Sequence, residues 1–159
     1  MSGELTHFDS SGASRIVNVG KKEITERMAR AQAFVSMEPA TLKLIQDRQL
    51  AKGDVLEVAR LAGIMATKQT QNLIPLCHSL GLDSASIDYE FVDERRVRIE
   101  ARVSNHGRTG VEMEAMTAVS IAALTIYDMC KAISKDMRII ETRLLEKTGG
   151  KSGDYQAQS

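Results

Sequence analysis

The segment from Arg95 to Ser104 constrains the fold most strongly, because apolar and charged residues alternate along it. In a β-strand, alternate side chains lie on opposite faces, so one face of this segment would be apolar and the other charged. The apolar set is Val97, Ile99, Ala101 and Val103, and the charged set is Arg96, Arg98, Glu100 and Arg102. The segment 84–92 also alternates and is joined to it by Asp93-Glu94, so the two predict a hairpin with one solvated face.

Helical patterns occur on both sides of this hairpin. Pro39 opens one predicted helix, which ends near Asp47, and Asp54 is suited to cap a second that runs to about residue 73. A third, from about Val111 to Ile133, carries small residues that permit close packing. Further strands are predicted at 15–19, 30–37 and 138–145. This order predicts an α+β fold, a ferredoxin-like two-layer sandwich with helices on one face of a mainly antiparallel sheet.

Composition limits the classes of protein to which the chain can belong. It has 159 residues, the usual size of one domain, and 43% of them are hydrophobic, which is enough for a core. Lys and Arg number 21, as do Asp and Glu, so neither a basic nucleic-acid coat nor a polybasic membrane binder is expected. The longest uncharged run, 115–127, is shorter than a membrane span.

The ends of the chain and its cysteines predict its organisation and compartment. We expect flexible termini at 1–14 and 154–159, with a single domain at 15–153 between them. The first residues contain no apolar core of a secretory signal, and Cys77 and Cys130 form no CxxC pair. These features predict a cytoplasmic chain with reduced thiols.

Asp128 and Lys131 are three residues apart, so they share one face of the predicted long helix. The spacing alone leaves two interpretations, an exposed ion pair or a partly desolvated pair that transfers protons. In the second case, burial would lower the lysine pKa while the carboxylate raised it. Lys52, next to Gly53, is by itself only a lysine at a turn that starts a helix.

Other candidate side chains lie near loops. Cys77 and His78 follow the helix-breaking Pro75, and neither a zinc site nor a nucleophilic cysteine has the partners that it needs in this sequence. Glu112 and Glu114 are either ordinary partners of a helix dipole, or one of them receives the N–H edge of a guanine-like ring.

The segment from Lys147 to Gly153 combines lysines with glycines. It is not a GxxxxGK[ST] phosphate loop, because residue 145 is Leu where that motif has Gly. It is therefore either a solvated tail or a cationic tail, carrying Lys151, that folds over an anion.

Six blocks in order give the chain a specific resemblance. They are AFVSM (33–37), KGDV (52–55), ARLAGI (59–64), LIPLCH (73–78), RVRIE (96–100) and TGVEMEAMTAVSIAALTIYDMCKA (109–132). The chain resembles the cyclic pyranopterin monophosphate synthases, the molybdenum cofactor biosynthesis proteins C, from Leu5 to Tyr155. One departure is Ser79, which stands where the family usually has proline after LCH and loosens the backbone there.

The resemblance implies a lyase that converts 3′,8-cyclised dihydro-GTP into cyclic pyranopterin monophosphate and releases pyrophosphate. By matching motifs, it implies that Asp128, Lys131 and Lys52 are catalytic. The implied substrate-binding residues are Leu76, Cys77, His78, Met113 and Glu114, together with Glu112 for the base edge and Lys147 and Lys151 for the triphosphate.

The resemblance also implies partners. A radical S-adenosylmethionine GTP cyclase would supply the nucleotide, and the chain would form a homohexamer, a trimer of dimers, with sites at subunit interfaces. No cofactor or metal site is implied, and any Mg²⁺ with the triphosphate would be held largely by the substrate. No nucleic acid or membrane partner is expected. Two competing interpretations are a non-catalytic nucleotide-sensing oligomer, which needs the pocket but not the lysines, and an interaction scaffold.

Overall fold

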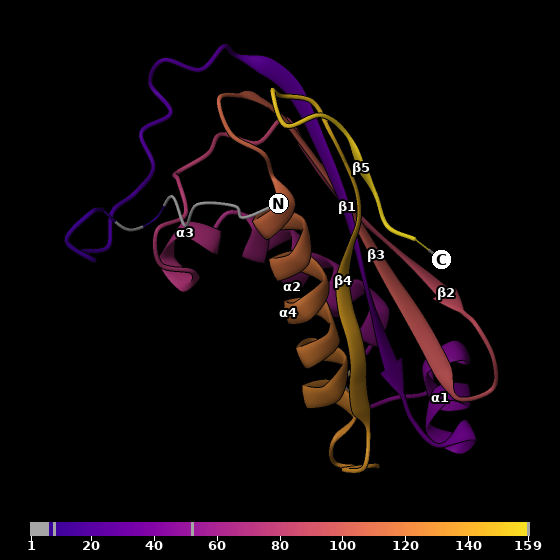
Figure 1. Ribbon diagram of the computed structural model, residues 1–159. Coiled ribbons are helices and arrows are strands. Elements are labelled where there is room, and N and C mark those ends of the chain that lie inside the picture. The colour runs from indigo at the N-terminus through magenta and orange to yellow at the C-terminus, as the bar shows by residue number, and fades with distance from the viewer. Residues whose placement is uncertain (1–6, 8, 52, 159) are drawn as a thin grey trace.

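The sheet follows the predicted antiparallel pattern. A computed structural model describes residues 7, 9–51 and 53–158. Within these, the strands are β1 (Thr25–Ser36), β2 (Ser84–Phe91), β3 (Arg96–Gly107), β4 (Arg138–Thr148) and the short β5 (Tyr155–Gln156). They lie in the order β2-β3-β1-β4-β5 with every neighbouring pair antiparallel (Figure 1). The four long strands have the order of a ferredoxin-like sheet, so the predicted fold class is confirmed.

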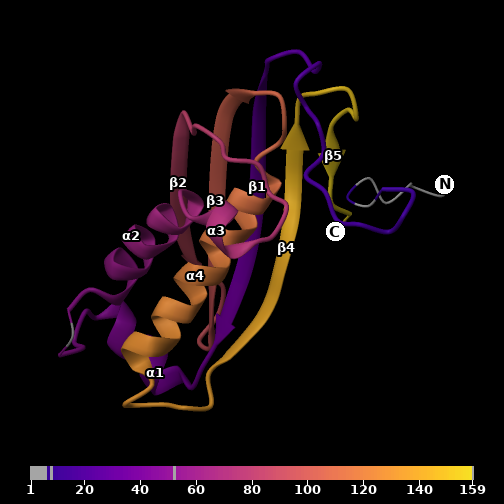
Figure 2. The same ribbon diagram turned by 90° about the vertical axis from the view of Figure 1, so that its left-hand side faces the viewer.

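The described helices are α1 (Pro39–Gln46), α2 (Val55–Thr67), α3 (Thr70–Leu73) and α4 (Glu112–Cys130). α2 and α4 lie on one side of the sheet, as Figure 2 shows, while α1 follows the end of β1. Asp54 caps α2 as predicted, since its carboxylate accepts hydrogen bonds from the backbone N–H groups of Leu56 and Glu57 at 3.1 and 3.2 Å. These bonds satisfy donors that the first turn of a helix leaves without partners.

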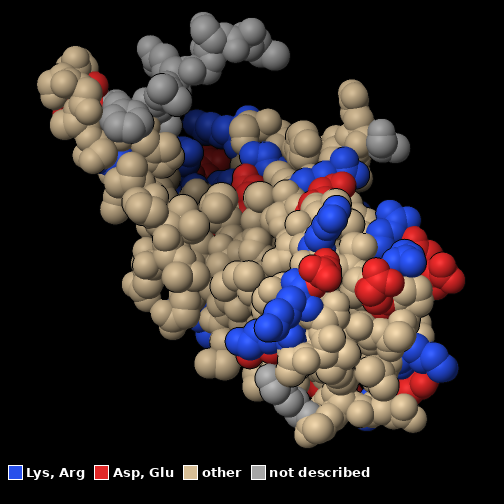
Figure 3. Space-filling view, turned by 90° about the horizontal axis from the view of Figure 1, so that it is seen from below, with Lys and Arg blue, Asp and Glu red and all other residues tan. Residues whose placement is uncertain are grey.

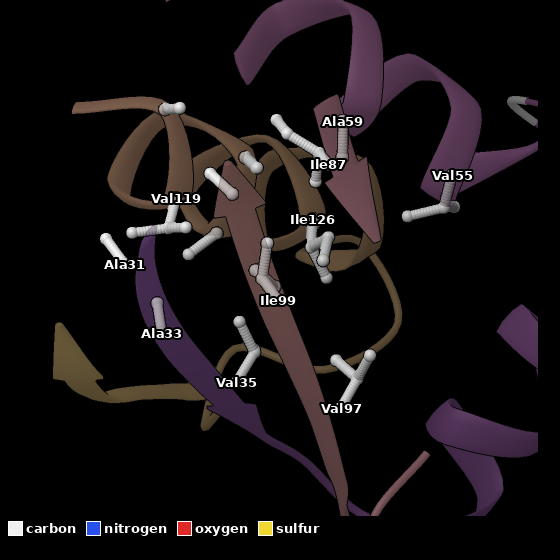
Figure 4. Packing of buried hydrophobic residues seen from close by; sticks show 14 of the residues in the cluster. Ala31, Ala33, Val35, Val55, Ala59, Ile87, Val97, Ile99, Val119 and Ile126 are labelled. Carbon is white, nitrogen blue, oxygen red and sulfur yellow. The ribbon is translucent and has the colours of Figure 1, made fainter. Parts of the chain in front are cut away.

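The core lies between α4 and the alternating residues of β1 and β3. The apolar positions predicted for β3 are all fully buried, as are Ala31, Ala33 and Val35 of β1. The small residues of α4, among them Ala115, Ala118 and Ala122, are also fully buried, which allows close packing of the helix on the sheet. Figure 4 shows Val119 and Ile126 of α4 together with Ala31 and Ile99 in this core.

α4 is long and apolar enough by composition to cross a membrane. Half of that apolar window is buried inside the molecule, where the helix packs against the sheet and α2. The composition of α4 is therefore that of a core helix.

The segment 15–19 does not form the strand that its alternation predicted. A strand needs a neighbour for its hydrogen-bond ladder, and this segment instead contacts the loop after α3, where Val17 accepts a hydrogen bond from His78. The prediction was wrong because alternation shows which side chains are apolar and does not show whether a partner strand is available.

The boundaries of other elements also differ from the predictions. β1 begins at Thr25 rather than residue 30, because its first residues pair with the end of β3, where Thr25 lies opposite Gly107. The helix predicted for 54–73 is divided into α2 and α3, β4 extends to Thr148, and α4 ends at Cys130.

Gly63 lies where α2 approaches both α4 and β2. A Cβ atom at this position would overlap Cδ1 of Ile87 and lie 2.8 Å from the carbonyl oxygen of Ala118. Because the α4 backbone is fixed by its own packing, we expect Gly63→Ala to lower the free energy of unfolding by about 1–3 kcal/mol. Urea denaturation measures this loss. Gly81→Ala is the control, since no atom lies within 4 Å of its added Cβ, and equal stabilities of the two variants would contradict the close approach.

Candidate functional site

One cavity of about 410 Å³, which we call the central pocket, lies where three segments of the chain meet. The loop after α3 carries Leu76, Cys77 and His78, and the first turn of α4 carries Glu112, Met113 and Glu114; all six line the pocket. The remaining lining residues are His7, Val17, Val19, Lys22, Leu80, Thr109 and Gly110. The fold thus brings together in space two motifs that lie more than thirty residues apart in the sequence.

His78 is held by the segment that precedes β1. Its Nε2 lies 2.6 Å from the carbonyl oxygen of Val17, so this nitrogen carries a proton and donates the hydrogen bond. In the neutral imidazole, Nδ1 is then the nitrogen that can accept a hydrogen bond. Leu76, two residues earlier, has φ of 66°, a strained conformation for a residue other than glycine and one that is often found at functional sites. Ser79, the departure from the family pattern, is exposed.

Glu114 and Cys77 are the lining groups whose acidity the protein changes most clearly. Burial raises the pKa of the Glu114 carboxyl, a backbone hydrogen bond opposes this shift, and the charge of Glu112 adds to it. Burial, with the charge of Glu114, also raises the pKa of the Cys77 thiol. A protonated thiol is a poor nucleophile, so Cys77 is suited to contact a ligand rather than to attack it.

The buried Glu114 carboxyl makes stability depend on pH. Because its pKa is raised in the folded state, ionisation destabilises the fold as the pH rises from below the unfolded value of 4.5 through the folded value. Glu114→Gln removes this cost, so we expect the variant to gain resistance to urea relative to the wild type at pH 7. The gain should shrink as the pH falls below 4.5. Urea denaturation of the variant and the wild type at pH 7 and at a pH below 4.5 measures this gain. An equal difference in stability at both pH values would contradict the burial of an ionisable carboxyl.

The two lysines near the C-terminus occupy different positions. Lys147 Nζ lies 3.0 Å from Oε1 of Glu112, and both side chains are partly buried, so this lysine is bound to the first turn of α4. Lys151 lines a second cavity of about 590 Å³, which shares Lys22 with the central pocket. Among the described residues, no group of three or more His, Cys, Asp or Glu side chains is placed to hold a metal ion.

Asp128 and Lys131 lie at the opposite end of α4 from the central pocket. Asp128 lies sixteen residues after Glu112, which is about 24 Å along the axis at the rise of an α-helix. Nζ of Lys131 lies 2.5 Å from Oδ1 of Asp128, and this hydrogen bond and the carboxylate charge raise the pKa of Lys131. In the single chain the pair is mostly in contact with solvent, because the side chains of Lys131 and Asp128 are 52% and 63% exposed, so the interpretation of a partly desolvated pair does not hold for one chain alone. Figure 3 views this end of the molecule, where charges of both signs lie beside a broad uncharged area.

The predicted site residues and the described lining of the pocket are not the same set. Lys52 lies outside the described residues, so its catalytic role stays a prediction. The lining residues Val17, Val19 and Lys22 were missed, because their segment has no motif and its alternation favours a strand. Thr109 and Gly110 could have been found, since they open the longest of the six sequence blocks.

Comparison with known proteins decides the family. Residues 16–150 match the model of the MoaC family, a range that contains every candidate site residue except Lys151. The chain belongs to the MoaC family. The resemblance read from the six sequence blocks is therefore confirmed.

Relatives of this MoaC-family chain match it over almost its whole length. A cyclic pyranopterin monophosphate synthase of Desulfitobacterium hafniense is 57% identical over 152 residues, which are 96% of this chain and 93% of the relative. A synthase of the same name from Chloroflexus aurantiacus is 58% identical over 154 residues, 96% of this chain and 94% of the relative. Cyclic pyranopterin monophosphate synthase 1 of Mycobacterium bovis is 55% identical over 152 residues, 96% of this chain and 89% of the relative.

Proposed function

We propose that this MoaC-family chain converts 3′,8-cyclised dihydro-GTP into cyclic pyranopterin monophosphate and releases pyrophosphate. It is a lyase of molybdenum cofactor biosynthesis that acts on a GTP-derived substrate. Family membership and identities of 55–58% to synthases of that name over nearly the whole chain support this activity.

The observation that carries the proposal is the convergence of the LCH loop with the first turn of α4. Together they give the central pocket a ring nitrogen on His78 and a buried carboxyl on Glu114. A purine-derived ring presents both N–H donors and carbonyl acceptors, so it requires groups of both kinds in a site that excludes much of the water. Met113 adds an apolar contact for the faces of the ring.

The reaction requires several proton transfers, because one ring must open and another must close. We assign these transfers to Lys131 and Lys52, with Asp128 holding Lys131 in position and setting its charge. The 2.5 Å contact between Asp128 and Lys131 supports this division of roles. Lys147 and Lys151 would supply positive charge to the phosphate oxygens as pyrophosphate departs.

A complete site requires a second copy of the chain in this proposal. Asp128 and Lys131 are about 24 Å from the first turn of the same α4, too far to reach a ligand in the central pocket. The outer face of α2 exposes Val58, Leu61 and Met65, an apolar surface of the kind that subunits cover. These two observations support an oligomer, and the family resemblance implies a homohexamer, a trimer of dimers. In that oligomer, one subunit would bring Asp128 and Lys131 to the central pocket of its neighbour.

The proposal also places the chain after a radical S-adenosylmethionine GTP cyclase in the cytoplasm. The product of such a cyclase, the cyclised nucleotide, would be the substrate of the enzyme proposed here. Any Mg²⁺ would enter with the substrate triphosphate.

The direct test is to incubate the purified chain with 3′,8-cyclised dihydro-GTP. We expect cyclic pyranopterin monophosphate and one equivalent of pyrophosphate. Chromatography measures the first product, and a coupled pyrophosphate assay measures the second. Binding of the nucleotide without either product would contradict the enzyme and would support the nucleotide-sensing oligomer instead.

A further inference from the structure

A further cavity, of about 280 Å³, which we call the side cavity, adjoins the central pocket. One of its walls is the loop 78–81 after α3, and the other is the end of β3 with the loop that follows it, 105–109. His78, Leu80, Thr109 and Val19 line both cavities, so the two share the wall that carries His78. A group bound in the side cavity would therefore lie between this loop and the end of the sheet.

Asn105, at the end of β3, places an amide in the wall of the side cavity. Its side chain continues the buried row formed by the apolar residues at alternate positions of 97–103, and it is only 1% exposed. Its Oδ1 is buried and accepts no hydrogen bond from any residue that the structure describes. Gly107 makes room for this amide, since an added Cβ there would lie 2.5 Å from Nδ2. A buried amide oxygen without a partner is costly, so an ordered water is the expected donor.

The loop on the other side of the cavity has unused backbone groups. Within the described part of the chain, the N–H and C=O groups of 78–82 form no backbone hydrogen bond. Bonds hold the chain just before and just after this segment, where the N–H groups of Cys77 and Asp83 lie 3.4 and 2.9 Å from their acceptors. His78 itself is bonded only through its ring, to Val17, which lies outside the sheet. The loop thus offers backbone donors close to an amide that lacks a partner.

We propose that Asn105 is a positioning residue, whose amide holds an ordered water that bonds the backbone of 78–82 and thereby fixes the position of His78. The water donates one hydrogen to Oδ1 of Asn105, and its oxygen accepts from a backbone N–H of the loop. The side cavity, at about 280 Å³, is large enough, because one water occupies about 30 Å³. The effect on turnover rests on the proposed function, in which His78 contacts the substrate.

The test is Asn105→Leu, which keeps the branched shape of the side chain and removes the amide. We expect KM for the cyclised nucleotide to rise by about 3- to 10-fold while kcat changes by less than about twofold, because the loop would adopt its binding arrangement less often. Hydrogen exchange of the backbone amides of 78–82, measured by mass spectrometry on the full chain, should become faster by about the same factor. Ser104→Ala, on the opposite face of β3, is the control and should change neither quantity.

Unchanged exchange of 78–82 in Asn105→Leu would overturn the inference, and a higher resistance to urea in the same variant would show that the amide has no partner. A crystal structure of the wild type that resolves ordered waters is a second measurement, which does not need the variant to fold. A water bonded to both Oδ1 of Asn105 and the loop supports the inference, and a side cavity without such a water overturns it. If exchange responds as expected but the wild type forms no pyranopterin product, the proposed function fails while the positioning role of Asn105 stands.

Discussion

Asp128→Asn is expected to lower kcat by roughly 100- to 10,000-fold while KM changes by less than about threefold. The substitution keeps the size of the side chain and removes the charge that lies 2.5 Å from Lys131. Because that carboxylate raises the pKa of Lys131, its loss should also move the alkaline limb of the rate profile to lower pH. Steady-state rates across pH measure both effects.

Asp47→Asn is the matched control for this substitution. Asp47 forms an ion pair with Lys43 at 3.1 Å at the end of α1. Like the pair of Asp128 and Lys131, it is an exposed ion pair at the end of a helix, but it lies outside the proposed site. We expect its rate and stability to remain near those of the wild type. A large rise in KM with unchanged kcat in Asp128→Asn would show that Asp128 binds substrate instead of supporting proton transfer.

The sequence predicted the fold class well because its strongest signals are set by burial on a single face. The alternation in β3 and the small residues of α4 each describe one side of one element, and both are buried as expected. The strand predictions were wrong for 15–19 and for the start of β1. At both places, strand formation depends on whether a segment distant in the sequence can pair with the strand through backbone hydrogen bonds. Periodicity within a segment carries no information about that partner.

The candidate site could be predicted only in part, for the same reason. The residues Leu76–His78 and Glu112–Glu114 came from motif matches, and the fold places them in one cavity. Val17, Val19 and Lys22 also line the pocket and were not found, because their segment has no motif and its alternation favours a strand. A site shared between subunits, as proposed above, could not be located from one sequence, because Lys131 of the single chain is exposed.

The proposed assembly of the site from two chains predicts that two inactive variants restore each other. His78→Ala removes a group from the central pocket, and Lys131→Ala removes one from the other end of α4, so each homo-oligomer should be nearly inactive. A mixed oligomer would contain sites in which the intact pocket of one chain meets the intact Lys131 of another. For random mixing, about a quarter of all sites would be intact.

Mixed oligomers of His78→Ala and Lys131→Ala, purified through a different tag on each chain, provide the most direct measurement. Mixed oligomers of Asp128→Asn and Lys131→Ala are the control, because both defects lie at the same end of α4 and no arrangement of these chains restores a site. We predict pyranopterin formation approaching a quarter of the wild-type rate in the first mixture and none above the parents in the second. A verified mixture of the first kind that remains as inactive as its parents would contradict a site shared between subunits.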